Sequence, residues 1–254
     1  MTERDIIVIK VGTGVLTRED GTLDSASLAR LVNAVADLPN HGQRVVLVSS
    51  GAVGAGISAL GLKEYPADVS ARQAAAAVGQ TRLMHAYENL FRSFDVSVAQ
   101  LLLTAADLEI EDHRLRICDL LERLVAEEGI LPVINENDSV AVEELSVGDN
   151  DMLSARVAAL LGARLLVLLT SVDGLFPPGA DAIVREVCSV GEVMSYAKEE
   201  KGRFAIGGMS SKLQAVKFAV EKGVETVIAN GRRPDRLSEI IAGDGFATRF
   251  RVGD

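Results

Sequence analysis

Two short polar clusters lie close together in the middle of the chain. The first is Asn135-Glu136-Asn137-Asp138 and the second is Gly148-Asp149-Asn150-Asp151. Taken singly, each is best explained as a surface turn, because Asn, Asp and Gly are turn-forming residues. Together, one after an apolar run and the other before the next, they match the place where open α/β sheets bind ligands. We therefore interpret them as two parts of one binding site, joined by a β-hairpin.

Two lysines stand next to glycine-rich turns. Lys10 ends the apolar segment 5–11 just before Gly12, and Lys212 follows Gly207-Gly208. A lysine beside free backbone amides suits an anion, because the ammonium supplies charge and the amides supply directed donors. The alternatives are an edge lysine that reaches into solvent at position 10 and an exposed lysine on a capped helix at position 212.

A third small-residue turn begins with Ser50-Gly51-Ala52, and its amides also suit a carboxylate or phosphate. Within it, Gly54-x-Gly56-x-x-Ala59 matches the loose dinucleotide fingerprint, so a dinucleotide-dependent oxidoreductase is one alternative function. The match starts several residues after the preceding strand, and no acidic residue closes a second strand about twenty positions later. We therefore disfavour this alternative.

Apolar runs and amphipathic stretches alternate along the chain and would position these groups. Strands are predicted at 5–11, 43–49, 96–103, 130–134, 164–169, 224–229 and 246–252, the last closing the sheet. Helices are predicted from Asp24, at 67–94 with a break near Gly79, at 113–128, at 152–161 with Asn150 or Asp151 as N-cap, from 207–212 onward and at 234–242. The alternation predicts an α/β fold, a three-layer αβα sandwich with a largely parallel central sheet.

The overall composition excludes several classes of protein. The 254 residues are 48% hydrophobic and 24% charged, which is typical of a soluble globular protein. A net charge of −10 argues against nucleic acid or an anionic membrane as partner. Cys118 and Cys188 lack the spacing of a metal site or disulfide framework. With no signal peptide and no membrane-spanning run, we expect a cytoplasmic protein.

Five motifs make a family resemblance specific. They are Val8–Thr13 (VIKVGT), Val48–Ala52 (VSSGA), Pro132–Asp138 (PVINEND), Val147–Ala155 (VGDNDMLSA) and Gly207–Leu213 (GGMSSKL). On these motifs the chain resembles the glutamate 5-kinase branch of the amino acid kinase family over essentially its whole length. The two polar clusters best distinguish this branch from other members of the family. Nucleoside-monophosphate, aspartate or carbamate kinases would not be expected to carry both clusters.

The resemblance implies transfer of the ATP γ-phosphoryl group to the side-chain carboxylate of L-glutamate, giving γ-glutamyl phosphate, the first step of proline biosynthesis. Such transfer depends mainly on positioning and neutralisation of charge, which suits two lysines. The implied catalytic residues are Lys10, Lys212 and Asp151, the last orienting a lysine. The implied glutamate-binding residues are Ser50, Gly51, Ala52, Asn135, Asp138, Asp149 and Asn150, with Asp138 as partner of the amine. The implied ATP-binding residues are Lys10, Gly12, Thr170, Ser171, Ile206, Gly207, Gly208, Met209, Ser210, Ser211 and Lys212.

Magnesium is expected as the companion of ATP, held by phosphates and water, with no metal-ligating residue assigned. The resemblance makes residues 1–254 one amino acid kinase domain, with about 1–165 as the amino-acid lobe and about 166–254 as the nucleotide lobe. We expect no second domain, although many bacterial relatives carry a C-terminal RNA-modification-type (PUA) domain. The Ala-rich helix 67–94 predicts a homodimer or homotetramer, and a product handover to glutamyl phosphate reductase is expected.

The chain departs from the family pattern near the nucleotide. Ser171 stands where the family usually has Asp, and Ala205-Ile206 replace the more usual Gly-Thr. These departures leave open a second alternative, a non-catalytic amino-acid sensor that kept the fold. Retention of Lys10, Asp151 and Lys212 argues for the kinase instead.

Overall fold

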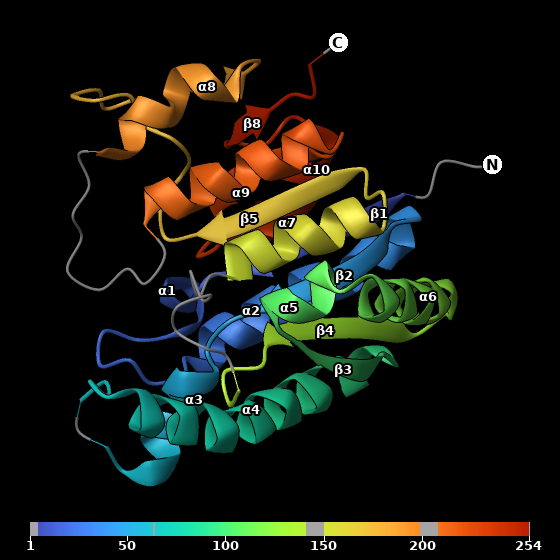
Figure 1. Cartoon of the computed structure of the whole chain (residues 1–254), viewed down its shortest axis with the longest axis vertical. Helices are drawn as coiled ribbons and strands as arrows, with labels where there is room; N and C mark the ends of the chain where they lie inside the picture. Colours follow the sequence, from blue (N-terminus) through green and yellow to red (C-terminus); the bar gives the residue numbers. More distant parts are fainter. Residues whose placement is uncertain (1–4, 63, 141–149, 199–207, 254) are drawn as a thin grey trace.

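A single mixed sheet runs through the molecule. The computed structural model describes residues 5–62, 64–140, 150–198 and 208–253. In this part of the chain, eight strands lie in the order β3-β4-β2-β1-β5-β7-β8-β6 (Figure 1). Their bounds are β1 Ile6–Val11, β2 Arg44–Ser49, β3 Ser97–Leu103, β4 Ile130–Glu136, β5 Leu165–Thr170, β6 Glu186–Val187, β7 Glu225–Asn230 and β8 Thr248–Phe250. Only the β7–β8 pair is antiparallel, which confirms the largely parallel sheet.

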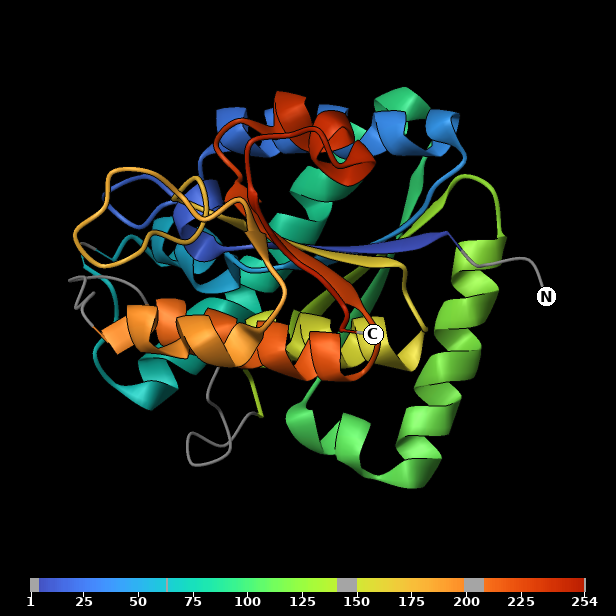
Figure 2. The same ribbon diagram turned by 90° about the horizontal axis from the view of Figure 1, so that it is seen from above.

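Helices cover both faces of the sheet and make the three predicted layers (Figure 2). One face packs against α1 (Thr13–Leu16), α2 (Ser25–Asp37), α3 (Ala52–Leu60), α4 (Val69–Phe91) and α10 (Leu237–Ala242). The other packs against α5 (Ala105–Glu109), α6 (Glu111–Ala126), α7 (Asn150–Leu160), α8 (Val190–Val193) and α9 (Met209–Glu221). Short 3₁₀ turns lie at Leu38–His41, Arg92–Phe94, Met194–Lys198 and Pro234–Arg236. None of the helices in the described ranges is long and apolar enough to cross a bilayer.

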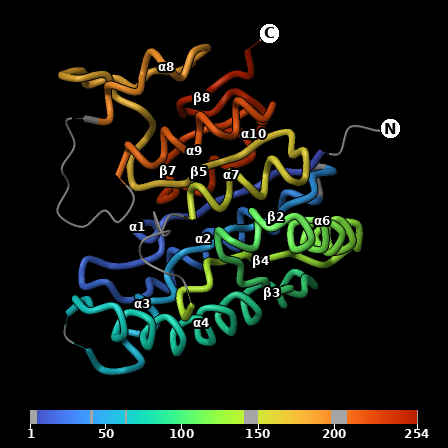
Figure 3. Tube along the Cα trace, viewed as in Figure 1, coloured from blue at the N-terminus to red at the C-terminus, as the bar shows by residue number. Residues whose placement is uncertain are grey.

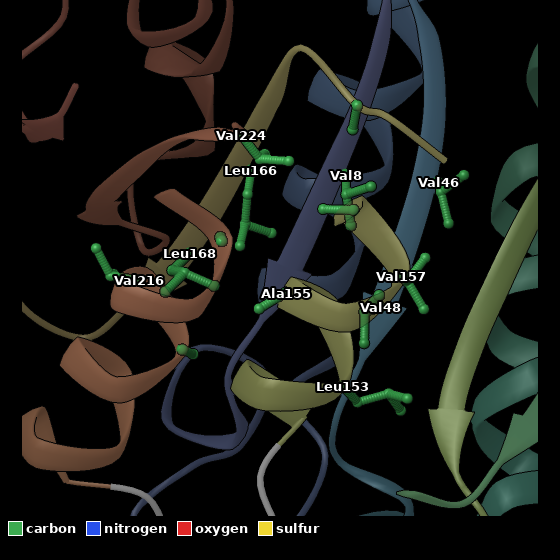
Figure 4. Packing of buried hydrophobic residues seen from close by; sticks show 14 of the residues in the cluster. Val8, Val46, Val48, Leu153, Ala155, Val157, Leu166, Leu168, Val216 and Val224 are labelled. Carbon is green, nitrogen blue, oxygen red and sulfur yellow. The ribbon is translucent and has the colours of Figure 1, made fainter. Parts of the chain in front are cut away.

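The central strand β1 shows why Lys10 faces the second helical layer. All its residues are buried, as expected for a strand covered on both faces. Ile7 and Ile9 belong to the core on the α2 side, whereas Ile6 and Val8 belong to the core on the α7 side. Because successive side chains of a strand point to opposite faces, Lys10 shares the side of Val8. Figure 4 shows that side of the sheet packed against α7 and α9.

The strand order reverses at β1, and this is where open α/β sheets bind ligands. β2, β4 and β3 follow on one side of β1, and β5 and β7 follow on the other. Figure 3 shows the blue-to-green half of the chain on one side and the yellow-to-red half on the other. Since these strands are parallel, they end at the same edge of the sheet, at Val11, Ser49, Glu136, Thr170 and Asn230.

Two predictions about the outer elements were wrong. The segment near 246–252 does not close the sheet, because β8 lies inside it and the two-residue strand β6 forms the edge. The helix predicted to break near Gly79 is continuous from Val69 to Phe91. Gly79 instead allows close helix packing, since an added Cβ would lie 1.8 Å from the Ala52 carbonyl oxygen on α3.

The start of α7 also differs from the prediction. Neither Asn150 nor Asp151 is its N-cap, because the helix begins at Asn150 and holds both residues in its first turn. By contrast, the predicted start at Asp24 is confirmed, since its side chain accepts a hydrogen bond from the Ala26 amide. The predicted hairpin between the polar clusters falls largely outside the described residues.

Candidate active site

One buried carboxylate joins two lysines at the point where the strand order reverses. Asp151 Oδ1 lies 2.5 Å from Lys10 Nζ, and Asp151 Oδ2 lies 3.0 Å from Lys212 Nζ. Asp151 is 0% exposed and Lys10 is 4% exposed. Each oxygen of the carboxylate therefore has an ammonium partner, and the trio, which we call the lysine bridge, carries a net positive charge. A buried cluster of this kind requires charge pairing, since an unpaired buried charge is strongly destabilising.

Three elements position the lysine bridge. Lys10 is the penultimate residue of β1, Asp151 lies in the first turn of α7, and Lys212 lies in the first turn of α9. The two helices pack side by side, which brings Lys212 to the carboxylate. The positive end of the α7 dipole favours a carboxylate at this position. Gly12 lies beside the lysine, since an added Cβ there would lie 3.3 Å from the Leu169 carbonyl oxygen and 3.6 Å from Lys10 Nζ.

A network of side-chain amides lies next to the bridge. Asn150 Nδ2 donates hydrogen bonds of 3.0 Å to Ser50 Oγ and of 3.0 Å to Asn135 Oδ1. Asn150 Oδ1 accepts a hydrogen bond of 3.2 Å from the Glu136 amide. The ends of β2 and β4 and the start of α7 are thus joined by polar contacts. The structure brings together three of the residues predicted to bind glutamate, namely Ser50, Asn135 and Asn150.

This network extends to a residue that the sequence analysis missed. Asn135 Nδ2 donates to Gln80 Oε1 at 2.8 Å, and Gln80 Nε2 donates to Gln100 Oε1 at 3.2 Å. Gln80 is buried on α4, on the face that also buries Ala76 and Leu83. The sequence signal that could have identified Gln80 was the helical spacing of Ala76, Gln80 and Leu83, which places the polar amide among apolar neighbours. A buried amide in that position requires hydrogen-bond partners.

Ser49 and Tyr87 make a second buried contact behind Ser50. Ser49 Oγ lies 2.8 Å from Tyr87 Oη, and both residues are fully buried. Burial raises the pKa of Tyr87 well above its usual value, although the Ser49 hydrogen bond opposes the rise. The phenol therefore keeps its proton and holds the end of β2 against α4.

The turn after Ser50 is shaped for backbone donors. Gly51 has φ +105°, a left-handed conformation that favours glycine, and it precedes the first residue of α3, Ala52. First-turn amides of a helix have no partner within the helix, so they are suited to a carboxylate. The glycines of the dinucleotide fingerprint serve packing instead. An added Cβ would lie 2.5 Å from the Gly21 oxygen at Gly54 and 1.9 Å from the Ala75 oxygen at Gly56.

Asp138 lies beyond the end of β4 and outside the hydrogen-bonded network. Within the described residues it makes no ion pair, and burial raises its pKa above the usual range. It lies near Tyr65, whose pKa is raised first by burial and further by the charge of Asp138. A partly buried carboxylate without a cationic partner among its described neighbours is suited to receive an ammonium group.

The residues predicted to bind ATP gather at the neighbouring strand ends. Thr170, buried at the end of β5, pairs in register with Asn230 of β7, and Asn230 Nδ2 donates to Asp173 Oδ1 at 2.9 Å. Ser171 is exposed and lies opposite Gly14.

At the start of α9, Gly208 is the N-cap and Met209 is the first helical residue. Ser210 is exposed, and Ser211 Oγ donates to the Gly208 oxygen at 3.0 Å. The predicted residues Asp149, Ile206 and Gly207 lie outside the described part of the chain, as does Ala205.

The described residues do not form a metal site of their own. No group of three or more His, Cys, Asp or Glu side chains in these ranges has the geometry to hold a metal ion. Both oxygens of Asp151 already face ammonium groups, so this carboxylate does not suit a resident cation.

Comparison with known proteins gives concordant results for family and fold. The family model of the amino acid kinase family matches residues 5–230. The glutamate 5-kinase of Symbiobacterium thermophilum is 46% identical over 250 residues, covering 96% of this chain and 95% of the relative. That of Clostridium acetobutylicum is 42% identical over 250 residues, covering 96% and 93%. Carbamate kinase from Giardia lamblia bound to AMP-PNP has a TM-score of 0.67 at 18% identity, covering 100% of both chains, and supports the fold alone.

Proposed function

The chain belongs to the amino acid kinase family, and on this premise we propose how its residues carry out the reaction. The protein is a kinase that transfers the γ-phosphoryl group of ATP to L-glutamate, as its relatives of matching length indicate. The acceptor is the side-chain carboxylate, and the product is γ-glutamyl phosphate. This step is the first of proline biosynthesis.

The lysine bridge supplies the charge stabilisation. In phosphoryl transfer, negative charge spreads over the equatorial oxygens while the attacking and leaving oxygens stay in line. Lys10 and Lys212 approach from β1 and α9 and neutralise that charge from two sides. Asp151 holds both ammonium groups in place before the substrates arrive, so little reorganisation is needed during the reaction.

The amide network binds glutamate. Ser50 and Asn150, with Asn135 behind them, offer hydroxyl and amide groups to the substrate carboxylates, and the amides of Gly51 and Ala52 add backbone donors. Asp149, next to Asn150 in the sequence, belongs to the same site. Asp138 pairs with the substrate ammonium. This ion pair compensates the partly buried carboxylate for the hydration that it has lost.

ATP binds on the other side of the bridge. Gly12 lies next to Lys10 on the phosphate side, and Thr170 and Ser171 contact the nucleotide from the end of β5. The residues Ile206, Gly207, Gly208, Met209, Ser210 and Ser211 surround the phosphates together with Lys212. Magnesium enters as part of the MgATP substrate.

Several wider features complete the proposal. Residues of about 1–165 form the glutamate lobe and residues of about 166–254 form the nucleotide lobe of one continuous sheet. The protein works in the cytoplasm as a homodimer or homotetramer, with α4 at the interface. Val78, an apolar residue of α4 that is 39% exposed, favours this face for contact between subunits. The labile acyl phosphate passes directly to glutamyl phosphate reductase.

The observation that carries the proposal is the single carboxylate shared by two lysines at the strand-order reversal. The test is ATP-dependent hydroxamate formation with glutamate, aspartate and N-acetylglutamate, and ATP turnover with UMP. Glutamate should react best, because the shorter aspartate misplaces its acceptor oxygen and small misplacements cost on the order of 10²-fold in rate. Equal turnover of aspartate would contradict the assignment. Glutamate binding without turnover would favour the amino-acid sensor.

A further inference from the structure

A separate pocket lies beside the ends of β5 and β7. It has a volume of about 270 Å³ and is lined by Asp173, Asn230, Arg233, Arg236, Ile240 and Phe246. Ile240 belongs to α10 and to the core on the α2 side of the sheet. The helices that carry Asp151 and Lys212 pack on the opposite side. The pocket is therefore distinct from the lysine bridge.

Two of the residues that line the pocket are arginines, Arg233 and Arg236. Within the described residues, neither Arg233 nor Arg236 makes an ion pair or a side-chain hydrogen bond, whereas nearby Arg249 and Arg251 both pair with Glu225. The one carboxylate of the lining does not pair with them either. Asp173 is held by Asn230, which leaves the arginine pair free to meet another anion.

A short turn fixes the spacing of the two arginines. The Arg236 amide donates to the Arg233 carbonyl oxygen at 3.2 Å, and the Arg233 amide donates to the Asn230 oxygen at 3.3 Å. Pro234 is buried at the first position of the 3₁₀ turn between them. The positions of the two arginines in the chain are thus fixed by backbone hydrogen bonds that lead back to the end of β7.

The remaining wall of the pocket is apolar. Ile240 is buried, whereas the ring of Phe246 is 46% exposed. The Arg185 guanidinium carbon lies 5.0 Å from the centre of that ring, and Arg185 Nη2 donates to the Gly245 oxygen at 2.8 Å. Arg185 therefore makes a cation–π contact with the Phe246 ring. An aromatic surface next to two arginines without ion-pair partners suits a ligand that has a negatively charged group and a flat apolar body.

We propose that this pocket binds a small organic anion, a carboxylate or phosphate monoester attached to a planar apolar group. Guanidinium forks bind the oxygens of either head group in bidentate fashion, and Phe246 with Ile240 covers the body of the ligand. The pocket lies on the opposite side of the sheet from the lysine bridge, and the proposal does not depend on the reaction proposed above.

Calorimetric titration of the full chain tests the site with phenyl phosphate, benzoate and inorganic phosphate, and with benzyl alcohol as a neutral analogue. At least one aromatic anion should bind, benzyl alcohol should not, and the better of phenyl phosphate and benzoate identifies the head group. Arg233→Gln and Arg236→Gln should each weaken that binding roughly tenfold, since each removes a charge-assisted contact. Arg116→Gln, an exposed arginine on α6, serves as the matched control and should bind as the wild type does.

Two further measurements separate the pocket from the active site. Phe246→Ala should weaken the aromatic anion while leaving any binding of inorganic phosphate unchanged, and kinase activity in all these variants reports that they fold. The proposal is overturned if neither aromatic anion binds, or if both arginine variants bind with wild-type affinity. It is equally overturned if ATP displaces the anion and Lys212→Ala abolishes its binding, because the anion would then occupy the phosphate-transfer site.

Discussion

The two sides of the lysine bridge differ in how completely their polar groups are paired. On the side that we propose for glutamate, hydrogen bonds join Ser50, Asn135, Asn150 and Gln80, which come from the ends of two strands and from two helices. On the side that we propose for ATP, the exposed Ser171 makes no side-chain hydrogen bond to the described part of the chain. The first region has its polar groups fixed before the substrate arrives. The second leaves polar groups for the nucleotide to engage.

This difference fits the two ligands. Glutamate is small, and an enzyme distinguishes it from near analogues only if buried polar groups would be left unpaired by the wrong molecule. A fixed amide network provides that penalty. ATP is large and highly charged, so a few strong contacts with ammonium groups can provide most of its binding. Selectivity should therefore depend on the glutamate side, and rate should depend on the bridge between the two sides.

The largest effect is expected from the lysine bridge. Lys10→Ala or Lys212→Ala should lower kcat by roughly 10²–10³-fold, because each lysine stabilises charge that develops in the transition state. The KM for glutamate should change much less, since this stabilisation is absent from the ground state. Arginine at either position should restore little activity, because its planar fork does not replace a compact ammonium. Steady-state kinetics on each variant, with circular dichroism to confirm folding, gives the measurement.

Lys217→Ala is the matched control for Lys212→Ala. It lies on the same helix, but its side chain is 54% exposed and faces Glu221. This variant should keep wild-type kcat. If Lys10→Ala or Lys212→Ala were as active as Lys217→Ala, that lysine would have no part in phosphoryl transfer.

The next largest effect is expected at Asp138, on the glutamate side. Asp138→Asn should raise the KM for glutamate by about tenfold or more, because a hydrogen bond between charged groups is lost. Burial raises the pKa of this carboxyl, so it gains a proton at a higher pH than an ordinary aspartate does. The protonated form cannot pair with an ammonium. In the wild type, the KM for glutamate should therefore rise as the pH falls through this raised pKa.

Kinetics across the acidic range test this pairing directly. Asp138→Asn should lose the acidic rise in glutamate KM, whereas Asp119→Asn, an exposed change on α6, should retain it. An unchanged pH profile in Asp138→Asn would assign the substrate ammonium to another group.

A smaller effect is expected where Gln80 supports the network from behind. Gln80→Leu preserves the side-chain volume but removes the hydrogen bond to Asn135, which should raise the KM for glutamate roughly fivefold. The KM for ATP should stay the same, because the network lies on the other side of the bridge. Gln214→Leu, an exposed change on α9, is the control. Equal shifts in both KM values would mean that Gln80 stabilises the fold as a whole and does not position the glutamate site.

The sequence predicted the parts of this site that depend on local pattern. Lys10 was predicted as a site residue because it stands near the end of an apolar run that a glycine follows, and the structure places it in a strand buried along its whole length. Gln80 was missed because its partner Asn135 lies 55 positions away, and their contact depends on how α4 packs. The glycines of α3 gave an ambiguous signal, since close packing and a nucleotide turn both require glycine. Strand β6 was not predicted because its two residues are too few to show an alternation of apolar and polar side chains.

The smallest effect is expected at Ser171. It tests the contrast between the two sides of the lysine bridge on the side proposed for ATP. Because Ser171 is exposed and offers the nucleotide at most one exposed hydrogen bond, Ser171→Ala should raise the KM for ATP by only about two- to threefold. Ser171→Asp restores the residue usual in the family and adds at most one exposed hydrogen bond, so it should lower that KM by only about two- to threefold. Glutamate KM should not respond to either change. Initial rates over a range of ATP concentrations at saturating glutamate measure both variants. A rise of tenfold or more in ATP KM for Ser171→Ala would show that the ATP side is as tightly organised as the amide network, and the contrast would fail.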